Sequence, residues 1–264
     1  MSNSTGMPGI DNSPVSIRMA FECAAATVSA FTVAPAVSIV DKAIVSNASG
    51  KEKLMSCLIG GVKEFFMKPT VFLRQPAFLM IWGVYSGTYC AANCIDALCE
   101  RSNQPAATPK FFGSAATNVT LSVLKDKAFA RLFGVGAARP LPLKSYGLFA
   151  TRDSMTILAS FTLPGIVGRN LEEKFGLAHN TADNLAQLVA PCMMQFVSSP
   201  LHLHGLDLYN REFASKTERI DFIKHEYLKT SLARIARIFP AFGIGGVVNK
   251  YIRKSGKQEI VKRF

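Results

Sequence analysis

Charged residues are scarce in this sequence. Asp, Glu, Lys and Arg make up 18% of its 264 residues, against about one quarter in ordinary globular chains, and hydrophobic residues make up 49%. Acidic residues are scarcer than basic ones, 18 against 30, which leaves a formal net charge of +12. Nucleic-acid-binding chains concentrate Lys and Arg beside exposed aromatic residues, whereas here the charges lie between long uncharged stretches. We therefore expect no nucleic-acid partner, and favour an anionic lipid such as cardiolipin or an anionic solute.

Sequence signatures of enzymes are also lacking. No Gly-rich phosphate loop follows a strand pattern, and neither a metal signature nor a nucleophile elbow is present. We therefore predict no enzyme activity, no catalytic residue and no cofactor. The first residues, 1–15, are polar and turn-rich without Lys or Arg, so they resemble neither a secretory signal nor a transit peptide. We expect a disordered N-terminus there.

Paired cysteine frameworks are missing as well. The chain has six cysteines, and most lie in apolar segments. Cys90 and Cys94 are one helical turn apart and are a conceivable metal pair, but no histidine or carboxylate accompanies them. We favour reduced thiols packed in an interior and predict no metal site.

Long uncharged stretches are what the sequence does have. They cover residues 23–40, 75–95, 111–124, 154–168, 184–206 and 238–249. The second and fifth reach the roughly 20 residues that cross about 30 Å of hydrocarbon, and the others need a charge within the span. We interpret the pattern as an all-α membrane protein with six transmembrane helices. A soluble all-α protein with partly buried helices is the alternative.

The segment 231–253 shows how such a span is predicted to begin. Arg234 and Arg237 are placed where a helix leaves the polar interface, Pro240 is tolerated inside a bundle, and the glycines that follow permit close helix contact. The same order of arginine before proline recurs at Arg139-Pro140 and at Arg74-Gln-Pro76. Three spans are therefore predicted to start alike.

Basic residues are concentrated in alternate links between the expected spans. The long links contain Lys42, Lys51, Lys53, Lys63 and Lys68; Lys125, Lys127, Arg131 and Arg139; and Arg211, Lys216, Arg219, Lys224, Lys229, Arg234 and Arg237. The short links contain only Arg101 and Lys110, or Arg169 and Lys174. Positive charge is thus predicted on one side of the membrane, with both termini on the other.

Two of the long links begin with a capping-box pattern, at Ser49–Glu52 and at Ser215–Glu218. A surface helix is expected after each box. With helix starts near residues 17, 111 and 182, the chain reads as three helix, surface helix and helix repeats. Their ranges are about 16–100, 108–168 and 180–254, inside a membrane domain 16–254 that precedes a basic tail, 255–264.

These units resemble the mitochondrial carrier family over roughly residues 17–254. Odd helices of that family carry Pro-x-Asp/Glu-x-x-Lys/Arg. Here Asp41-Lys42 follows Pro35 late, Lys125-Asp126-Lys127 has no proline, and Pro200 precedes displaced charges. The even-helix gate motif is also incomplete, because Tyr85-Ser-Gly-Thr-Tyr89 lacks charges and Tyr251-Ile-Arg253 lacks the acid.

The resemblance implies a multi-pass protein of the inner mitochondrial membrane, with the outer membrane as the alternative. It implies transport of a small anionic metabolite, and it implies substrate binding by Arg74, Arg139 and Arg237. The incomplete gates favour a second hypothesis, a non-transporting scaffold or subunit of a mitochondrial membrane complex.

Arg152 and Asp153 are the candidates that the residues themselves supply. Ionisable groups at mid-depth cost roughly 2.5–3.5 kcal/mol each, so they face a partner or a watery cavity. Because neighbours in a helix point about 100° apart, each is expected to pair with another helix. The pair is either a solute site or a buried ion pair that fixes helix register. His202 and His204 follow Pro200 in an apolar setting, and a ligand role is not favoured for them.

Overall fold

The computed structural model of the chain describes residues 13–134, 140–161 and 163–263, and every regular element in these ranges is helical. The elements are α1 (Val15–Ala48), α2 (Leu54–Met67), α3 (Pro69–Leu73), α4 (Pro76–Arg101), α5 (Ala107–Phe133), α6 (Leu143–Phe161), α7 (Leu163–Phe175), α8 (His179–Asn210), α9 (Lys216–Ile238), the π-helical η1 (Phe239–Gly245) and α10 (Gly246–Arg263). The all-α prediction is confirmed.

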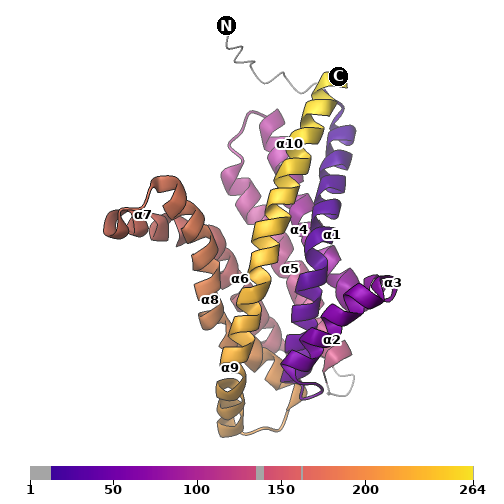
Figure 1. The fold of residues 1–264 in the computed structure, drawn as a ribbon, viewed down its shortest axis with the longest axis vertical. Coiled ribbons are helices and arrows are strands. Elements are labelled where there is room, and N and C mark those ends of the chain that lie inside the picture. The colour runs from indigo at the N-terminus through magenta and orange to yellow at the C-terminus, as the bar shows by residue number, and fades with distance from the viewer. Residues whose placement is uncertain (1–12, 135–139, 162, 264) are drawn as a thin grey trace.

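The long helices form a ring (Figure 1). α1 packs on α4, α4 on α5, α5 on α6, α6 on α8, and α8 on α9. The rod that begins with α9 continues through η1 into α10 and returns to α1, which closes the ring. The short helices α2 and α3 lie outside it near the lower end in Figure 1, and α7 packs beside α8 at the upper left. We call the six members of the ring rods: α1, α4, α5, α6, α8 and the continuous α9–η1–α10. A closed ring leaves an interior that all six rods of the described chain can line.

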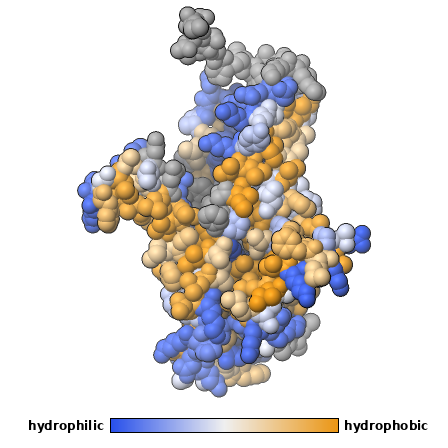
Figure 2. Space-filling model, in the orientation of Figure 1, coloured by the Kyte–Doolittle hydropathy of each residue, from blue (hydrophilic) through white to orange (hydrophobic). Residues whose placement is uncertain are grey.

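Apolar side chains cover the middle of the molecule. Figure 2 shows hydrophobic residues across the middle of one face, and hydrophilic residues gathered toward its two ends. Large exposed residues include Val28 and Phe31 of α1, Met193 and Val197 of α8, and Val247 of α10. Such a belt suits lipid better than water. By length and apolar composition, α1 is the one helix of the described chain that qualifies by itself as a membrane span.

Small residues set the closest helix contact. Ala26, Ala30 and Ala34 of α1 are fully buried. Short side chains at one-turn spacing let two helix backbones approach closely, so α1 and α4 pack along much of their length. Phe78, Phe129 and other apolar side chains continue this core, and the Phe78 ring lies 5.5 Å from that of Phe31 in α1.

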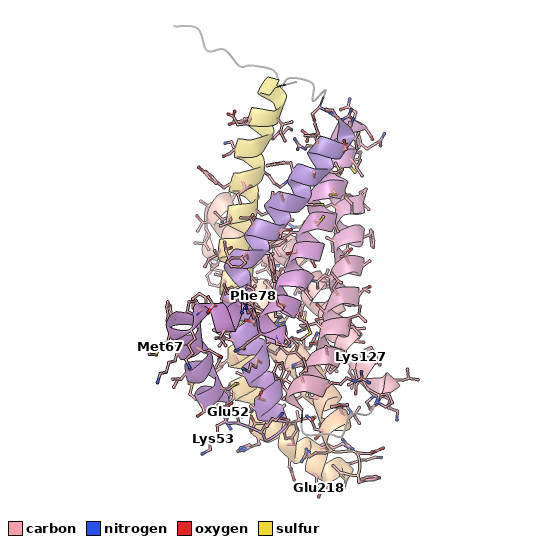
Figure 3. All side chains as sticks on the ribbon, turned by 90° about the vertical axis from the view of Figure 1, so that its right-hand side faces the viewer. Glu52, Lys53, Met67, Phe78, Lys127 and Glu218 are labelled. Carbon is pink, nitrogen blue, oxygen red and sulfur yellow. The ribbon has the colours of Figure 1, made fainter. Side chains whose placement is uncertain are left out.

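The long links share one end of the molecule. Figure 3 shows Glu52, Lys53, Lys127 and Glu218 toward the lower end, which also holds the α1–α2, α5–α6 and α8–α9 connections (Figure 1). Lys53 and Lys127, from two of the basic links, thus lie toward the same end. One predicted surface helix, α2, lies in its place, whereas the second is the beginning of the continuous α9 rod.

One of the two predicted capping boxes forms. Ser215 N–H donates to Glu218 Oε2 at 2.6 Å, and Glu218 N–H donates to Ser215 Oγ at 3.3 Å. The Ser49 box is wrong, because α2 begins only at Leu54, whose N–H donates to Asn47 Oδ1 at 3.0 Å. Ser49 Oγ instead donates to backbone carbonyls, those of Ser46 and Phe133.

The sixth rod departs from its predicted form. Pro240 lies in η1 rather than in a membrane entry, and the rod runs unbroken to Arg263, so the expected basic tail continues α10 as helix. Of the glycines after Pro240, Gly245 packs against Val33 and Tyr89, whereas Gly246 has open space around it. Arg234 is 1% exposed, so its side chain faces the other helices of the bundle.

Candidate functional site

A cavity of about 280 Å³ lies inside the ring. Every rod contributes to its wall: Asp41 from α1, Tyr85 from α4, Lys125 from α5, Arg152 from α6, Gln195 from α8 and Arg237 from α9. On α5 the lining extends from Lys110 to Lys125, a distance of about 22 Å along the helix. The Lys110 side chain is 40% exposed and that of Lys125 only 7%, so the cavity opens at the Lys110 end and is closed at the other.

The closed end holds ion pairs between several rods. Lys125 Nζ lies 2.7 Å from Asp41 Oδ2 and 2.8 Å from Asp126 Oδ1. Arg237 Nη1 also donates to Asp41, through Oδ1. Asp41 therefore joins α1 to both α5 and α9. Charges taken out of water need such partners, because an unpaired buried charge is costly.

Arg152 extends this cluster into α6 and α8. Its Nη2 lies 2.6 Å from Asp126 Oδ2 and 2.6 Å from Asp153 Oδ1, and its Nη1 lies 2.7 Å from His202 Nδ1. Because a guanidinium only donates, that histidine nitrogen accepts. The expectation that each of the two residues pairs with another helix is confirmed for Arg152, through Asp126 of α5, and is wrong for Asp153, because the long Arg152 side chain folds back onto its neighbour.

One carboxylate oxygen at the closed end remains available. Asp153 Oδ1 accepts from Arg152 Nε and Nη2, whereas Oδ2 is buried and has no hydrogen-bond partner among the described residues. Asp153 lines the cavity, and its side chain is 9% exposed. A buried acceptor without a partner costs about 1–3 kcal/mol, so this oxygen is suited to an N–H group inside the cavity.

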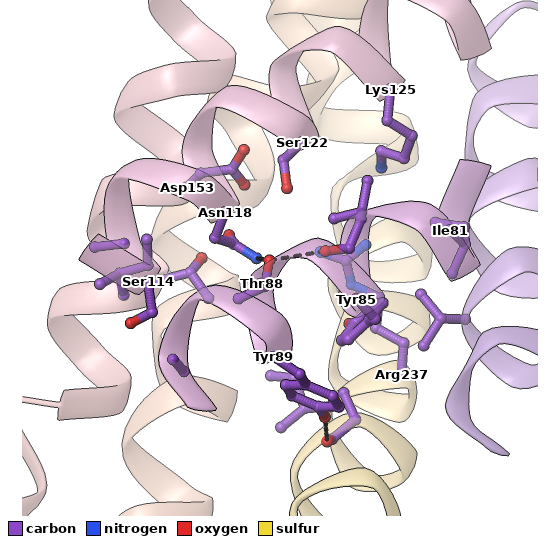
Figure 4. A pocket seen from close by; sticks show the side chains of 18 of the residues that line it. Ile81, Tyr85, Thr88, Tyr89, Ser114, Asn118, Ser122, Lys125, Asp153 and Arg237 are labelled. Carbon is purple, nitrogen blue, oxygen red and sulfur yellow. Dashed lines mark hydrogen bonds between the residues drawn. The ribbon is translucent and has the colours of Figure 1, made fainter. Parts of the chain in front are cut away.

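Neutral polar groups line the wider part of the cavity. Figure 4 shows Thr88, Asn118 and Ser114 on the wall between Asp153 and the two tyrosines of α4. Asn118 Nδ2 donates to Thr88 Oγ1 at 3.3 Å, and the Tyr89 hydroxyl donates to the Ala241 carbonyl at 3.1 Å. Hydrogen bonds between side chains of different helices hold this wall in shape.

A second ionic network lies near the open end. Arg18 pairs with Glu22 at 2.9 Å, as the four-residue spacing on α1 predicts, and Arg253 Nε reaches the same carboxylate at 2.5 Å. Arg253 and Lys110 also pair with Asp96, at 2.8 and 3.2 Å. This network joins α1, α4, α5 and α10. No described residue of α6 or α8 takes part, so it does not close the ring at this end.

The structure brings together three of the five predicted site residues. Arg152, Asp153 and Arg237 line the cavity. Arg74 is exposed at the end of α3, outside the cavity, and Arg139 lies outside the described residues.

Sequence reasoning did not assign Asp41 and Lys125 to the site. It treated them as displaced motif charges, although both lie inside long helices, where an ionisable group indicates an inward-facing position. That signal, applied to every helix, finds both residues.

Cysteines form the one group of at least three metal-ligating side chains within mutual reach in the described chain. Cys23 of α1 joins Cys90 and Cys94 of α4, and all three Sγ atoms lie within 4.8 Å of one another. The two histidines that follow Pro200 belong to no such group among the described residues.

The comparisons with known proteins identify the family. Residues 25–257 match the family described as "Probable citrulline exporter", whereas no curated protein and no solved structure matches the chain. No carrier family matches, so the predicted membership of the mitochondrial carrier family is wrong. Prolines and arginines at helix ends occur in many helical membrane proteins, and the charged motifs that distinguish a carrier are displaced here. The match covers the helices that line the cavity and supports transport across a membrane. The chain belongs to the family of probable citrulline exporters.

Proposed function

We propose that this chain exports citrulline, or a neutral amino acid of closely similar chemistry, through the central cavity. The observation that carries the proposal is a cavity that presents cations and a carboxylate at its closed end and neutral polar groups above them. An amino acid with an uncharged polar side chain likewise has a charged part, its carboxylate and ammonium, and a neutral polar part, so it matches both regions of the cavity. The family description names citrulline, which is a member of this class.

The charges of the closed end favour a solute that carries both signs. Lys125, Arg152 and Arg237 are balanced by Asp41, Asp126 and Asp153. Arg234 is buried and does not line the cavity, and its guanidinium contacts the neutral groups of Gln195 and Ser198. Arg237 in the cavity wall attracts a carboxylate, and Asp153 accepts a positive group. We therefore replace the anionic substrate predicted from the sequence with a zwitterion.

The proposal places all six rods across the membrane. At 1.5 Å per residue, the 34 residues of α1 extend about 51 Å, more than the roughly 30 Å of hydrocarbon. The other rods lack the apolar composition of α1, but several of their charged residues, such as Lys125, Arg152 and Arg237, line the cavity, where lipid is excluded. The predicted threefold repeat pairs α1 with α4, α5 with α6, and α8 with the α9–α10 rod, and it stays part of the proposal.

Passage through the ring requires the closed end to open. Asp41 is shared by Lys125 and Arg237, so parting these ion pairs separates α1 from α5 and α9. A substrate with its own carboxylate and ammonium can form new ion pairs with these side chains, which replace part of the interaction that is lost when the original pairs separate. Binding and opening are thereby coupled in the proposed transport step.

Counterflow into liposomes tests the proposal. Liposomes holding the purified full chain and unlabelled citrulline are expected to accumulate labelled citrulline saturably. Arg237→Gln should lower the rate by about tenfold or more because a charge-assisted contact is lost. Arg74→Gln is the matched control and should keep the wild-type rate, because Arg74 is exposed outside the cavity. No uptake across neutral, cationic and anionic amino acids and organic acids would overturn the proposal.

Other parts of the sequence interpretation stay predictions. The mitochondrial inner membrane is tested by fractionation of cells that express the tagged chain. We also propose that the chain has no enzyme activity, that it contacts anionic lipid, and that it binds no nucleic acid. The scaffold alternative predicts co-purification with a larger assembly, but a charged, open cavity is not a feature that a scaffold requires.

A further inference from the structure

We infer that Asp153 is the specificity residue that accepts the substrate's ammonium group. This inference depends on the proposed function, because it assigns a role within the same cavity. It begins from the buried Oδ2 atom of Asp153, which lines the cavity and has no partner among the described residues. Figure 4 shows the Asp153 carboxylate on the same side of the cavity as Ser122 and Asn118.

Arg152 fixes the position of this carboxylate. It donates to Oδ1 through Nε at 2.9 Å and Nη2 at 2.6 Å, so the carboxylate plane cannot turn freely. The same guanidinium stabilises the negative charge of Asp153. The other oxygen is thus held in place, charged and available, which is what a subsite for a cationic N–H group requires.

Arg237 is the group that fits the substrate carboxylate. Its side chain is 18% exposed, and it donates to Asp41 through Nη1, so other guanidinium N–H groups remain for a ligand. Figure 4 shows Arg237 across the cavity from Asp153. A carboxylate on one side and an ammonium on the other define an α-amino acid. The uncharged remainder then lies against Thr88, Ser114 and Asn118.

The test compares citrulline with its desamino analogue, 5-ureidopentanoate, which keeps the carboxylate and the ureido group. Wild-type protein is expected to bind citrulline about ten- to a hundredfold more tightly, as measured by competition with labelled citrulline in liposomes. In Asp153→Asn this preference should fall to about twofold or less, whereas Asp153→Glu should retain most of it. Asp221→Asn, at an exposed position of α9, is the control and should behave as wild type.

The outcomes separate the two claims. If wild-type protein takes up no citrulline, the proposed function fails. If it does, and Asp153→Asn keeps the wild-type preference for citrulline, the assignment of Asp153 fails while the function stands. Thermal melting of each variant shows whether a loss of binding reflects unfolding, and Asp153→Glu keeps the test informative if the asparagine variant does not fold.

A separate observation supports a second inference. We infer that Cys23, Cys90 and Cys94 form a binding site for a soft metal cation of the Cu(I) class. Cys23 Sγ lies 3.8 Å from Cys94 Sγ, and Cys90 Sγ lies 3.9 Å from Cys94 Sγ. Three sulfurs bound to one ion at about 2.3 Å lie about 4 Å apart in a plane, so little movement is needed. Thiolate ligands without histidine or carboxylate select soft ions.

The cluster is separate from the cavity. The cavity-lining residues of α4, which include Tyr85, Thr88 and Tyr89, point about half a turn away from Cys90 and Cys94. All three cysteines are partly exposed, and Cys23 lies about 12 Å from the start of α1, so an ion reaches them without crossing the transport site. Each sulfur that binds releases its proton to water, and the ion keeps its oxidation state.

Copper binding by the purified full chain tests this site. Cu(I), supplied with ascorbate and a competing chelator, is expected to bind one equivalent with a sulfur-to-copper band in the ultraviolet. Cys23→Ser, Cys90→Ser and Cys94→Ser should each weaken binding about tenfold or more, whereas Cys192→Ser, which removes a partly exposed thiol of α8, should not. Equal binding by the triple serine variant and wild type would show that the three thiols only pack together.

Discussion

Arg152 is the residue on which the closed end of the cavity depends. Its guanidinium contacts Asp126, Asp153 and His202, and its side chain is 2% exposed. We predict that Arg152→Met lowers the free energy of unfolding by about 3–5 kcal/mol, because it leaves the buried Asp153 carboxylate without its cation and leaves Asp126 with Lys125 alone. Denaturation in detergent, followed by circular dichroism, measures the change.

Matched variants isolate this effect. Arg74→Met changes an exposed arginine and should alter stability by about 0.5 kcal/mol or less. The double variant Arg152→Met, Asp153→Asn should recover part of the loss, because the carboxylate left without a cation is removed. An Arg152→Met protein as stable as the Arg74→Met control would show that the cluster contributes no net stability.

At this scale the sequence predicted residues but not their partners. Arg152, Asp153 and Arg237 are detectable because charges inside apolar helices are expensive. Asp41 and Asp126 complete the cluster from α1 and α5, and nothing in one sequence tells which helix supplies the partner of a buried arginine. The predicted site therefore lacked two of the three carboxylates that balance it, Asp41 and Asp126.

At the scale of elements, η1 packs closely against α1 and α4 at Gly245. A Cβ atom at Gly245 would meet Val33 and Tyr89 well inside contact distance, whereas one at Gly246 would meet nothing. We predict that Gly245→Ala destabilises the protein by about 1–3 kcal/mol through overpacking. Gly246→Ala should be neutral or stabilising by about 0.4–1 kcal/mol, because alanine restricts the unfolded chain.

Thermal melting of the two variants side by side checks this pair. Since both changes add one methyl group to adjacent helical positions, they differ only in the space around it. Equal melting temperatures would mean that the rod shifts to accommodate the methyl group at no cost.

The start of α9 carries a pH-dependent cap. The pKa of the Glu218 carboxyl is lowered from 4.5 by its hydrogen bonds with the Ser215 backbone and hydroxyl. Because the folded pKa is lowered, the stabilisation is present above pH 4.5 and is lost as the pH falls through the lowered value. We predict that hydrogen exchange in the first turn of α9 loses protection over that interval.

Glu218→Gln provides the control for this cap. Glutamine accepts the same backbone hydrogen bond without titrating, so the protection of that turn should no longer respond to acid. If this variant still loses protection in acid as the wild type does, a group other than Glu218 causes the pH dependence.

Helix starts also show what the sequence can and cannot specify. Both capping boxes follow the same pattern, yet the Ser215 box forms and the Ser49 box does not. Ser49 closes the end of α1, and its hydroxyl reaches the Phe133 carbonyl of α5. A tertiary contact thus overrides a local signal, which single-sequence reasoning does not include.

For the whole molecule, helix content follows from composition, whereas ring closure does not. Six uncharged stretches predicted six rods; five of them fall on one rod each, whereas the fourth, 154–168, begins in α6 and reaches into α7. The unbroken course of α9, η1 and α10 was not predicted over its full length, because the sequence analysis separated a surface helix after the Ser215 box and a tail at 255–264 from the span at 231–253. The family was also predicted wrongly, because prolines at helix ends are common to helical membrane proteins in general. The residues that line the cavity come from segments far apart in the sequence, so their grouping was not visible.

The same rod gives a prediction about membrane topology. From Lys216 to Arg263 it extends about 70 Å, more than twice the roughly 30 Å of hydrocarbon. Its two ends must therefore face opposite sides if it crosses. We predict that, in sealed vesicles from expressing cells, a protease site inserted beside the 95% exposed Phe213 and a protease site at the C-terminus are cut from opposite sides. Detergent should expose both sites. Cleavage of both from one side of intact vesicles would mean that the rod lies along the membrane, and the ring could not then conduct a solute across it.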